Sequence, residues 1–311
     1  MKTNINTPTP WPELDFIKMQ DTIETLHQWI QIVGKIRLKT MPWQNHSWHS
    51  TLYITSNGFS TNGIPYDGRI FQIDFNFRKH QLIVQCSDTS ELIMDLYPRT
   101  VADFHHELFE KLKSIGINVK IHPKPNELEP AIPFKENTLN KSYDPKAAFA
   151  LWQAMLKANQ VFTKFRSEFI GKASPVHLFW GAFDLALTRF SGKKAPLHPG
   201  GMPNMPIEVM QEAYSHEVSS AGFWPGSKDS PNPVFYSYVY PTPDSFAKQK
   251  VLPDQAFFSP EMGEFFLSYS VVQKADNPEK MLYDFLATTY LAAANSAQWD
   301  RDALESARVN C

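Results

Sequence analysis

Residues 174–226 carry three motifs, around which we expect the rest of the chain to be organised. Residues 174–192 read S-P-V-H-L-F-W-G-A-F-D-L-A-L-T-R-F-S-G, residues 197–201 read L-H-P-G-G, and residues 214–226 read Y-S-H-E-V-S-S-A-G-F-W-P-G. Ionisable side chains alternate there with aromatic residues and with glycines, which allow tight turns and close backbone approach. We expect strands in this stretch, and we expect the functional site to lie on it.

The composition describes a globular chain. With 311 residues, 42% hydrophobic and 20% charged, the protein is long enough for two domains or one large core. The formal net charge is -2, and Lys and Arg are scattered along the chain rather than clustered. A nucleic-acid-binding protein normally presents a basic stripe, so we expect no nucleic-acid partner.

The cellular compartment is predicted from what the chain lacks. Residues 1–10 have no apolar core of a secretory signal, and residues 281–294 are too short and too polar for a membrane span. Cys86 and Cys311 form neither a zinc-type spacing nor a disulfide framework. These features predict a cytoplasmic protein with no membrane partner, and they leave its oligomeric state open.

Periodicity predicts an α+β fold. Apolar residues recur at helical spacing in four segments. The first follows a capping box at Asp21, the second begins at residue 100, and the third and fourth begin at Asp144-Pro145 and at Asn277-Pro278. Alternation typical of strands appears at 49–56, 69–77, 81–86, 91–96, 234–240 and 264–272. Short turns between the first strands indicate an antiparallel meander, with helices packed on the sheet faces.

The order helix, meander, helix occurs twice. We therefore predict two similar halves, 11–122 and 144–298, joined by a proline-rich linker at 123–143. The second half carries longer loops, which hold the motif cluster. The repetition predicts an internal duplication; the alternative is chance, because α+β chains often alternate in this way.

Five motifs resemble those of a known family. They are W-P-E-L at 11–14, N-H-S-W-H at 45–49, and the three motifs quoted above. Together they are similar to an uncharacterised bacterial family, known only as a domain of unknown function, over nearly the whole chain. The resemblance implies that these segments belong to one protein, and it implies no activity, ligand or catalytic residue.

Metal binding is one interpretation of the histidines. His46, His49, His177 and His216 could supply imidazole ligands to a divalent metal, completed by a carboxylate. No pair has the H-E-x-x-H spacing of a helical zinc site. The competing interpretation, which we favour, is that these histidines form local hydrogen bonds among aromatic rings.

Acid–base chemistry without a metal is a second interpretation. His177, His216, Glu217 and Asp184 are the candidate catalytic residues, because a histidine beside a carboxylate in an aromatic surrounding can titrate near neutrality. No G-x-S-x-G elbow suggests a nucleophilic serine.

Ligand binding would use the residues around these groups. Arg189 is the candidate anion anchor, although it could instead form a structural salt bridge with Asp184. The remaining candidate contacts to a substrate are Trp180, His198, Tyr214 and Trp224. The glycines match neither a phosphate-binding loop nor a dinucleotide fingerprint, so the sequence contains no nucleotide-cofactor motif.

The sequence leaves three functional hypotheses. The first is an enzyme that acts on a small, anionic or aromatic molecule through a histidine and carboxylate cluster in a pocket between the halves. The second is a non-catalytic protein that binds a small molecule and has structural histidines. The third is a scaffold that binds a partner. Reaction type and substrate are not determined at this level.

Overall fold

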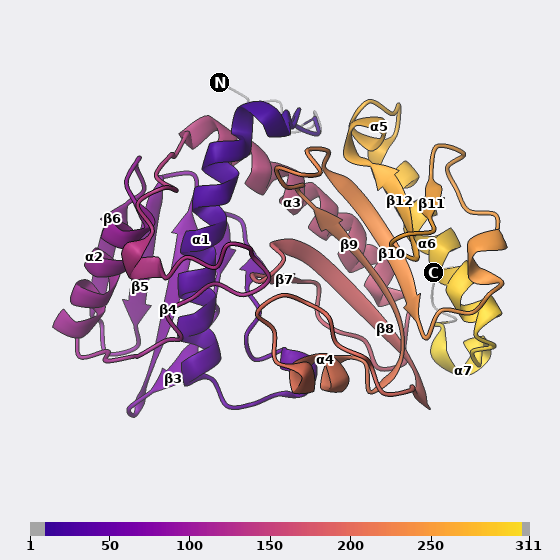
Figure 1. Ribbon diagram of the computed structural model, residues 1–311, viewed down its shortest axis with the longest axis horizontal. Coiled ribbons are helices and arrows are strands. Elements are labelled where there is room, and N and C mark those ends of the chain that lie inside the picture. The colour runs from indigo at the N-terminus through magenta and orange to yellow at the C-terminus, as the bar shows by residue number, and fades with distance from the viewer. Residues whose placement is uncertain (1–9, 307–311) are drawn as a thin grey trace, which may run out of the picture.

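The computed structural model describes residues 10–306 and has the predicted α+β architecture (Figure 1). The first half contains α1 (Phe16–Thr40), η1 (Asn45–Ser47), β1 (Tyr53–Ile54), β2 (Gly58–Ser60), β3 (Ile64–Tyr66), β4 (Arg69–Asn76), β5 (Gln81–Cys86), β6 (Glu91–Asp95) and α2 (Val101–Ser114). The second half contains α3 (Pro145–Ser167), β7 (His177–Phe179), β8 (Asp184–Lys194), α4 (Ile207–Ala213), β9 (His216–Trp224), β10 (Val234–Tyr240), η3 (Phe246–Lys248), β11 (Phe257–Ser259), β12 (Glu264–Ser268), α5 (Tyr269–Gln273), α6 (Pro278–Ser296) and α7 (Arg301–Leu304). Between the halves, residues 115–144 contain only η2 (Phe134–Glu136).

Each half has one antiparallel sheet of six strands. The first sheet has the order β1-β2-β4-β5-β6, with β3 also paired to β4, and the second has the order β11-β12-β10-β9-β8-β7. Leu52 and Leu178 join the two sheets at their inner edges, where each amide donates to the carbonyl of the other, at 2.9 and 2.8 Å. The order helix, strands, helix thus occurs in both halves, and its origin by duplication stays a prediction.

The helix starts follow from local capping. Asp144 caps α3 and Asn277 caps α6, each with proline at the start of the helix, as predicted. Thr100 caps α2 by accepting the amide of Asp103. Helix α1 begins earlier than its predicted capping box at Asp21, because Asp15 accepts the amide of Lys18 and thereby provides the cap.

Two predicted strands are shorter in the structure. Of residues 49–56, only Tyr53–Ile54 is strand, because the preceding residues form η1 with His46 and Ser47 at positive φ. Of residues 264–272, only Glu264–Ser268 is strand, and the chain then turns into α5. Alternation of apolar residues continues across both boundaries, so periodicity alone did not mark them.

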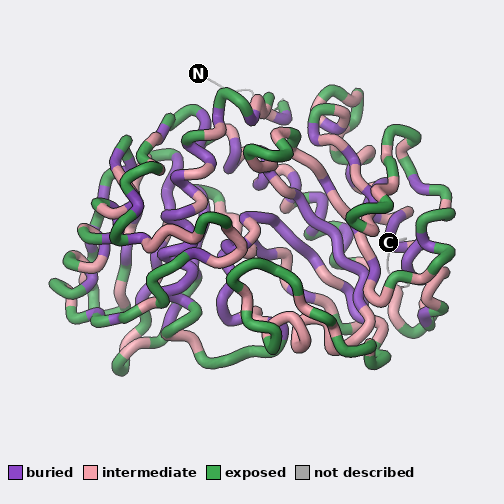
Figure 2. Tube along the Cα trace, viewed as in Figure 1, coloured by how far each residue is buried: buried purple, intermediate pink, exposed green. Residues whose placement is uncertain are grey.

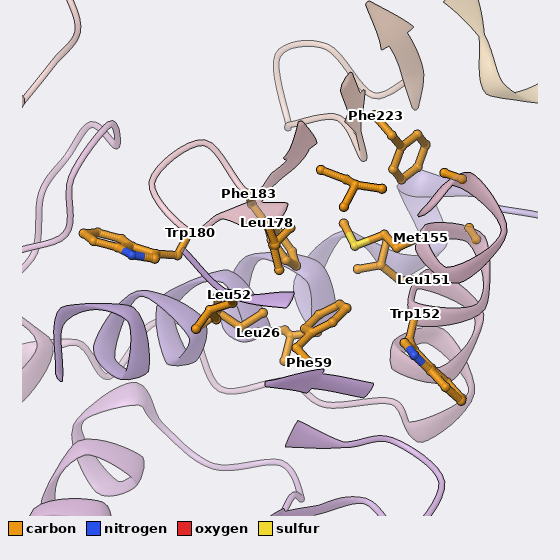
Figure 3. Close-up of a cluster of buried hydrophobic side chains, with 14 of the residues drawn as sticks. Leu26, Leu52, Phe59, Leu151, Trp152, Met155, Leu178, Trp180, Phe183 and Phe223 are labelled. Carbon is orange, nitrogen blue, oxygen red and sulfur yellow. The ribbon is translucent and has the colours of Figure 1, made fainter. Parts of the chain in front are cut away.

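The buried side chains form one hydrophobic cluster across both halves. Figure 3 shows Leu26 of α1, Phe59 of the first sheet, Leu151 and Met155 of α3, and Phe223 of the second sheet in one group. The strands and α1 hold most of the buried residues, and the turns hold most of the exposed ones (Figure 2). Among residues 10–306, no helix has both the length and the apolar character needed to cross a membrane.

Helix α1 approaches the second half very closely at Gly34. A Cβ atom built on Gly34 would lie 2.6 Å from Nε1 of Trp180 and closer still to two other indole atoms. The same indole Nε1 donates to the carbonyl of Ser50 at 2.8 Å, which fixes the ring. Glycine is therefore required here by packing, inside a helix where it is otherwise unfavourable.

Substituting this glycine tests the packing. Gly34→Ala should gain up to about 1 kcal/mol of helix propensity but should lower the free energy of unfolding overall, by roughly 1–3 kcal/mol, because the methyl group collides with a fixed indole. Urea denaturation measures the change. In a Trp180→Ala background the same substitution should be neutral or stabilising; equal destabilisation in both backgrounds would contradict the packing argument.

Candidate functional site

The second sheet has one apolar face and one polar face. Residues Leu185, Leu187, Phe223, Phe235, Val239 and Phe265 are buried, on the face covered by α3 and α6 (Figure 1). Because side chains alternate along a strand, the residues between them point to the other face. The register places Thr188, Ser220 and Tyr238 side by side on that face. Asp184, Tyr236 and Glu264 lie on it as well, and we call it the polar face.

Asp184 and Tyr236 form the centre of the polar face. The Tyr236 hydroxyl donates a hydrogen bond to Oδ2 of Asp184. To reach it, the tyrosine ring lies directly on the backbone of Gly222, where a Cβ atom would be 2.5 Å from Cε1 of the ring and closer to the hydroxyl. The glycine of the S-S-A-G-F-W motif is thus explained by this contact.

Three carboxyl groups of this region have raised pKa values: Asp184 itself and its two neighbours Glu127 and Glu264. Burial raises the pKa of Asp184 to about 6, although the hydrogen bond from Tyr236 acts in the opposite direction. Burial, assisted by the negative charge of Asp184, raises the pKa of Glu127 to about 7 and that of Glu264 to about 7. Glu127 and Glu264 therefore both sense the charge of Asp184. Within residues 10–306, none of them forms a salt bridge.

Phenol and hydroxyl groups fill the space beside the carboxyls. The hydroxyls of Tyr214 and Tyr238 are 2.9 Å apart, and the rings of Tyr236 and Tyr238 are stacked with centroids 6.1 Å apart. Burial raises the pKa of Tyr214 to about 12 and raises the pKa values of the other two tyrosines as well. All three phenols are therefore neutral near pH 7 and can donate hydrogen bonds.

Glu127 reaches the polar face from the segment between the halves. Its carboxyl packs on Gly181, where a Cβ atom would be 2.8 Å from Cδ of Glu127 and closer to Oε1. Its amide donates to the carbonyl of Pro203 at 3.0 Å. The loop 195–206, which carries the H-P-G-G motif beside α4 (Figure 1), is thus attached to the same segment.

A second contact fixes this loop. The side-chain amide of Asn204 donates to the carbonyl of Leu128 at 3.1 Å and to Oε1 of Glu129 at 3.0 Å. Gly200 and Gly201 have φ values of 81° and 121°, which only glycine adopts readily, and so form the turn. His198 stacks on Tyr214 with ring centroids 4.4 Å apart, next to the carboxyl and phenol cluster.

Of the residues predicted from the sequence, Asp184 and Tyr214 lie in the cluster and His198 lies at its border. Trp224, at the end of β9, is half-buried and pairs with Val234. Trp180 lies apart, against Gly34.

Arg189 lies on the opposite face from Asp184 and does not pair with it. Its guanidinium donates to the carbonyl of Phe165 and lies 3.5 Å from the centroid of that ring. Burial lowers its pKa to about 10. The anion-anchor role predicted for Arg189 is therefore corrected, because the group is enclosed between β8 and α3 and cannot reach a ligand on the polar face.

The candidate catalytic histidines and Glu217 are not assembled around Asp184. His177 is completely buried, neither ring nitrogen has a hydrogen-bond partner among the described residues, and burial lowers its pKa to about 3. His216 contacts the hydroxyl of Ser215 at 3.1 Å. Glu217 accepts a hydrogen bond from the Ser191 hydroxyl at 2.9 Å. Each of these three groups has its own local environment.

The histidines do not form the predicted metal set. Nδ1 of His46 faces the carbonyl of Ala213 at 3.3 Å, and its Nε2 faces Nζ of Lys172 at 2.6 Å. Nδ1 of His49 faces backbone atoms of Gln44. Across residues 10–306, no group of three or more His, Cys, Asp or Glu side chains could hold a metal ion. Local hydrogen bonding, the favoured alternative, describes His46 and His49.

Glu127, Glu264, Tyr236 and Tyr238 were not identified from the sequence. The alternation V-F-Y-S-Y-V-Y at 234–240 puts its tyrosines on one strand face and was an available signal. Glu127 lies in a segment without periodicity, so nothing in the local sequence distinguished it.

A wide surface hollow lies elsewhere. Its volume is about 800 Å³, and its lining includes Lys18, Arg99, Asp103 and Asp144 near the starts of α1, α2 and α3. It is open to solvent, and none of the three carboxyls Asp184, Glu127 and Glu264 lines it. We place the candidate site on the polar face because the shifted and interacting groups gather there.

The hydrogen bond to Asp184 can be tested by removing one oxygen. Tyr236→Phe should raise the pKa of Asp184 above about 6, because the donated hydrogen bond stabilises the ionised carboxylate. Carboxyl ¹³C NMR titration measures this pKa. Tyr240→Phe, which removes a hydroxyl bonded to the carbonyl of Pro196, serves as the control and should leave Asp184 unchanged. An unchanged pKa of Asp184 in Tyr236→Phe would show that this hydrogen bond is absent in solution.

The position of the Glu127 carboxyl can be tested through Gly181. Gly181→Ala should displace the carboxyl toward water, so that its pKa falls from about 7 toward the ordinary 4.5. The same NMR titration detects the change. Gly171→Ala is the matched control, since that glycine is crowded by Leu304 and Phe169 instead. If the pKa of Glu127 falls in Gly171→Ala as well, the change is not specific to Gly181.

Comparison with known proteins places the chain in a family without assigning an activity. Searches of curated proteins and of solved structures each found no match. A family model described as a family of unknown function, DUF5996, matches residues 11–306, which includes all five motifs and both sheets. The chain therefore belongs to the DUF5996 family.

Proposed function

We propose that the protein is an enzyme that applies general acid–base catalysis to a small molecule on the polar face. The observation that carries the proposal is the coupling of Asp184, Glu127 and Glu264, whose pKa values of about 6, 7 and 7 lie near neutrality. Acids and bases transfer protons best when their pKa lies near the working pH. Perturbed and interacting carboxyls gather preferentially at catalytic sites.

The three carboxyls divide into two roles. Near pH 7, Asp184 is mostly ionised, with Tyr236 as hydrogen-bond donor, and is suited to accept a proton. Glu127 and Glu264 are each close to half protonated and are suited to donate one. The neutral phenols of Tyr214 and Tyr238 would orient the substrate by hydrogen bonds.

The charge of the site restricts the substrate. The groups named on the polar face are carboxyls, phenols and hydroxyls, and Arg189 is on the opposite face. An anion would be repelled by the ionised carboxylates. The proposed substrate therefore carries no negative charge, and its polar groups can bond to carboxyl and hydroxyl oxygens. The anionic substrate considered from the sequence is not supported by this arrangement.

The histidines have no catalytic role in this proposal. His46 is held by Lys172 and by Ala213, and its pKa is lowered to about 4, first by burial and then by the charge of Lys172. His177 is enclosed and neutral. These contacts support structural roles, as in the binding-protein hypothesis, but that hypothesis does not account for three carboxyls poised near neutrality.

The proposal can be tested by screening and substitution. A thermal-shift screen of uncharged sugars, polyols and amines, with carboxylates and phosphates as negative controls, identifies binders, and NMR then follows their conversion. Glu127→Gln and Glu264→Gln should each lower kcat by roughly 100-fold or more while keeping the fold, because each removes a titrating proton.

The control for these variants is Glu217→Gln, since Glu217 is bonded to Ser191 outside the cluster. It should retain wild-type turnover, with a pH profile that is bell-shaped around pH 6–7. Full turnover in Glu127→Gln and Glu264→Gln would sink the assignment. Tight binding without conversion of any ligand would favour the non-catalytic binding protein.

A further inference from the structure

Two of the three carboxyls depend on residues in unusual backbone conformations. Glu127 itself has a φ of 58°, and Phe183, directly before Asp184, has a φ of 61°. Residues other than glycine adopt this left-handed region only at a cost in free energy, so surrounding contacts must hold them there. Segment 126–127 comes from the linker between the halves, and segment 181–184 comes from the second half.

One side chain of α1 contacts both segments. Gln31 is completely buried. Its Nε2 donates to the carbonyl of Asn126 at 2.8 Å and to the carbonyl of Gly181 at 3.2 Å, and its Oε1 accepts the amide of Asn126 at 2.8 Å. Its single amide group thus fixes the peptide before Glu127 and the turn before Asp184.

Neighbouring residues on the same helix face complete the support. One turn before, His27 faces the carbonyl of Gly181 through Nε2 at 2.9 Å, and its ring stacks on Phe183. One turn after, Nζ of Lys35 donates to Oδ1 of Asn126. Gln31 lies between them and is the only one of the three hydrogen-bonded to both segments within residues 10–306.

We propose that Gln31 is a positioning residue that sets the distance between the carboxyls of Glu127 and Asp184. Because each carboxyl senses the charge of the other, their separation determines how far their titrations are split. Gln31 touches neither carboxyl and acts only through backbone. The inference rests on the proposed function for the catalytic role of the two carboxyls. Whether Gln31 positions these carboxyls can be tested separately.

The experiment compares two variants of the full chain, Gln31→Leu and Gln28→Leu, with the wild type by carboxyl ¹³C NMR. Gln31→Leu removes every hydrogen bond of the Gln31 side chain, including the 3.2 Å contact of its Nε2 with Nε2 of His27. Gln28→Leu is the matched control, because Gln28 is a buried glutamine of the same helix whose Oε1 has no hydrogen-bond partner in the described part of the chain. Urea denaturation verifies that each variant is folded.

The expected result is specific to Gln31. In Gln31→Leu, the proton affinity of Glu127 should fall tenfold or more, because its carboxyl moves toward water and away from Asp184, and one pKa unit is a factor of ten. Gln28→Leu should leave that affinity unchanged, because the Oε1 of Gln28 has no hydrogen-bond partner among the described residues. Equal Glu127 titrations in Gln31→Leu and Gln28→Leu would overturn the inference, because Gln31 would then be merely structural.

Failure of the proposed function has a different signature. If Glu127 of the wild-type protein titrates near 4.5, the acid–base assignment fails. The carboxyl ¹³C shift of Glu127 at pH 9, where the group is ionised in either case, then reports its contact with Gly181. A change of this shift in Gln31→Leu, but not in Gln28→Leu, supports the positioning role, and no change in either overturns it.

Discussion

The two halves of the chain meet at a close contact between Gly34 and the indole of Trp180. It brings α1, an element of the first half, against the turn that precedes β8 in the second half. Because α1 packs so closely on this turn, the Gln31 side chain can reach the peptides of both Asn126 and Gly181. A Cβ atom at this position would collide with the indole, so the close approach of the helix to the turn requires glycine.

The polar face is unusual in its charge. Buried carboxylates are normally paired with cations, because desolvation of an unpaired charge is costly. Here Asp184 is buried and Glu127 and Glu264 are half-buried, without a salt bridge in the described residues, and the protein accommodates the three carboxyls by raising their pKa values. The resulting protonation equilibrium near neutral pH is a liability for stability and an asset for proton transfer, which is the trade-off expected of a catalytic site.

The sequence predicted the fold more completely than the site. Caps at Asp144 and Asn277, alternation in β4 and β10, and the glycine-rich motifs were all readable, because they depend on neighbours within a few residues. For the candidate site, the sequence offered Asp184 and Tyr214, which lie in the carboxyl and phenol cluster, and a salt bridge from Arg189 to Asp184, which β8 prevents by placing the two side chains on opposite faces. A one-residue step along a strand reverses the face, and local sequence does not say which face is covered.

Periodicity and capping were enough to predict the α+β class and the two antiparallel halves, because both depend on residues that are close in sequence. The grouping of the three carboxyls follows only from the folded chain. Glu127 comes from a segment without regular structure and Glu264 from the far side of the second sheet, and their pKa values depend on burial by the assembled chain. Desolvation and charge coupling act through space, so residues distant in sequence acquire their function only when the fold brings them together.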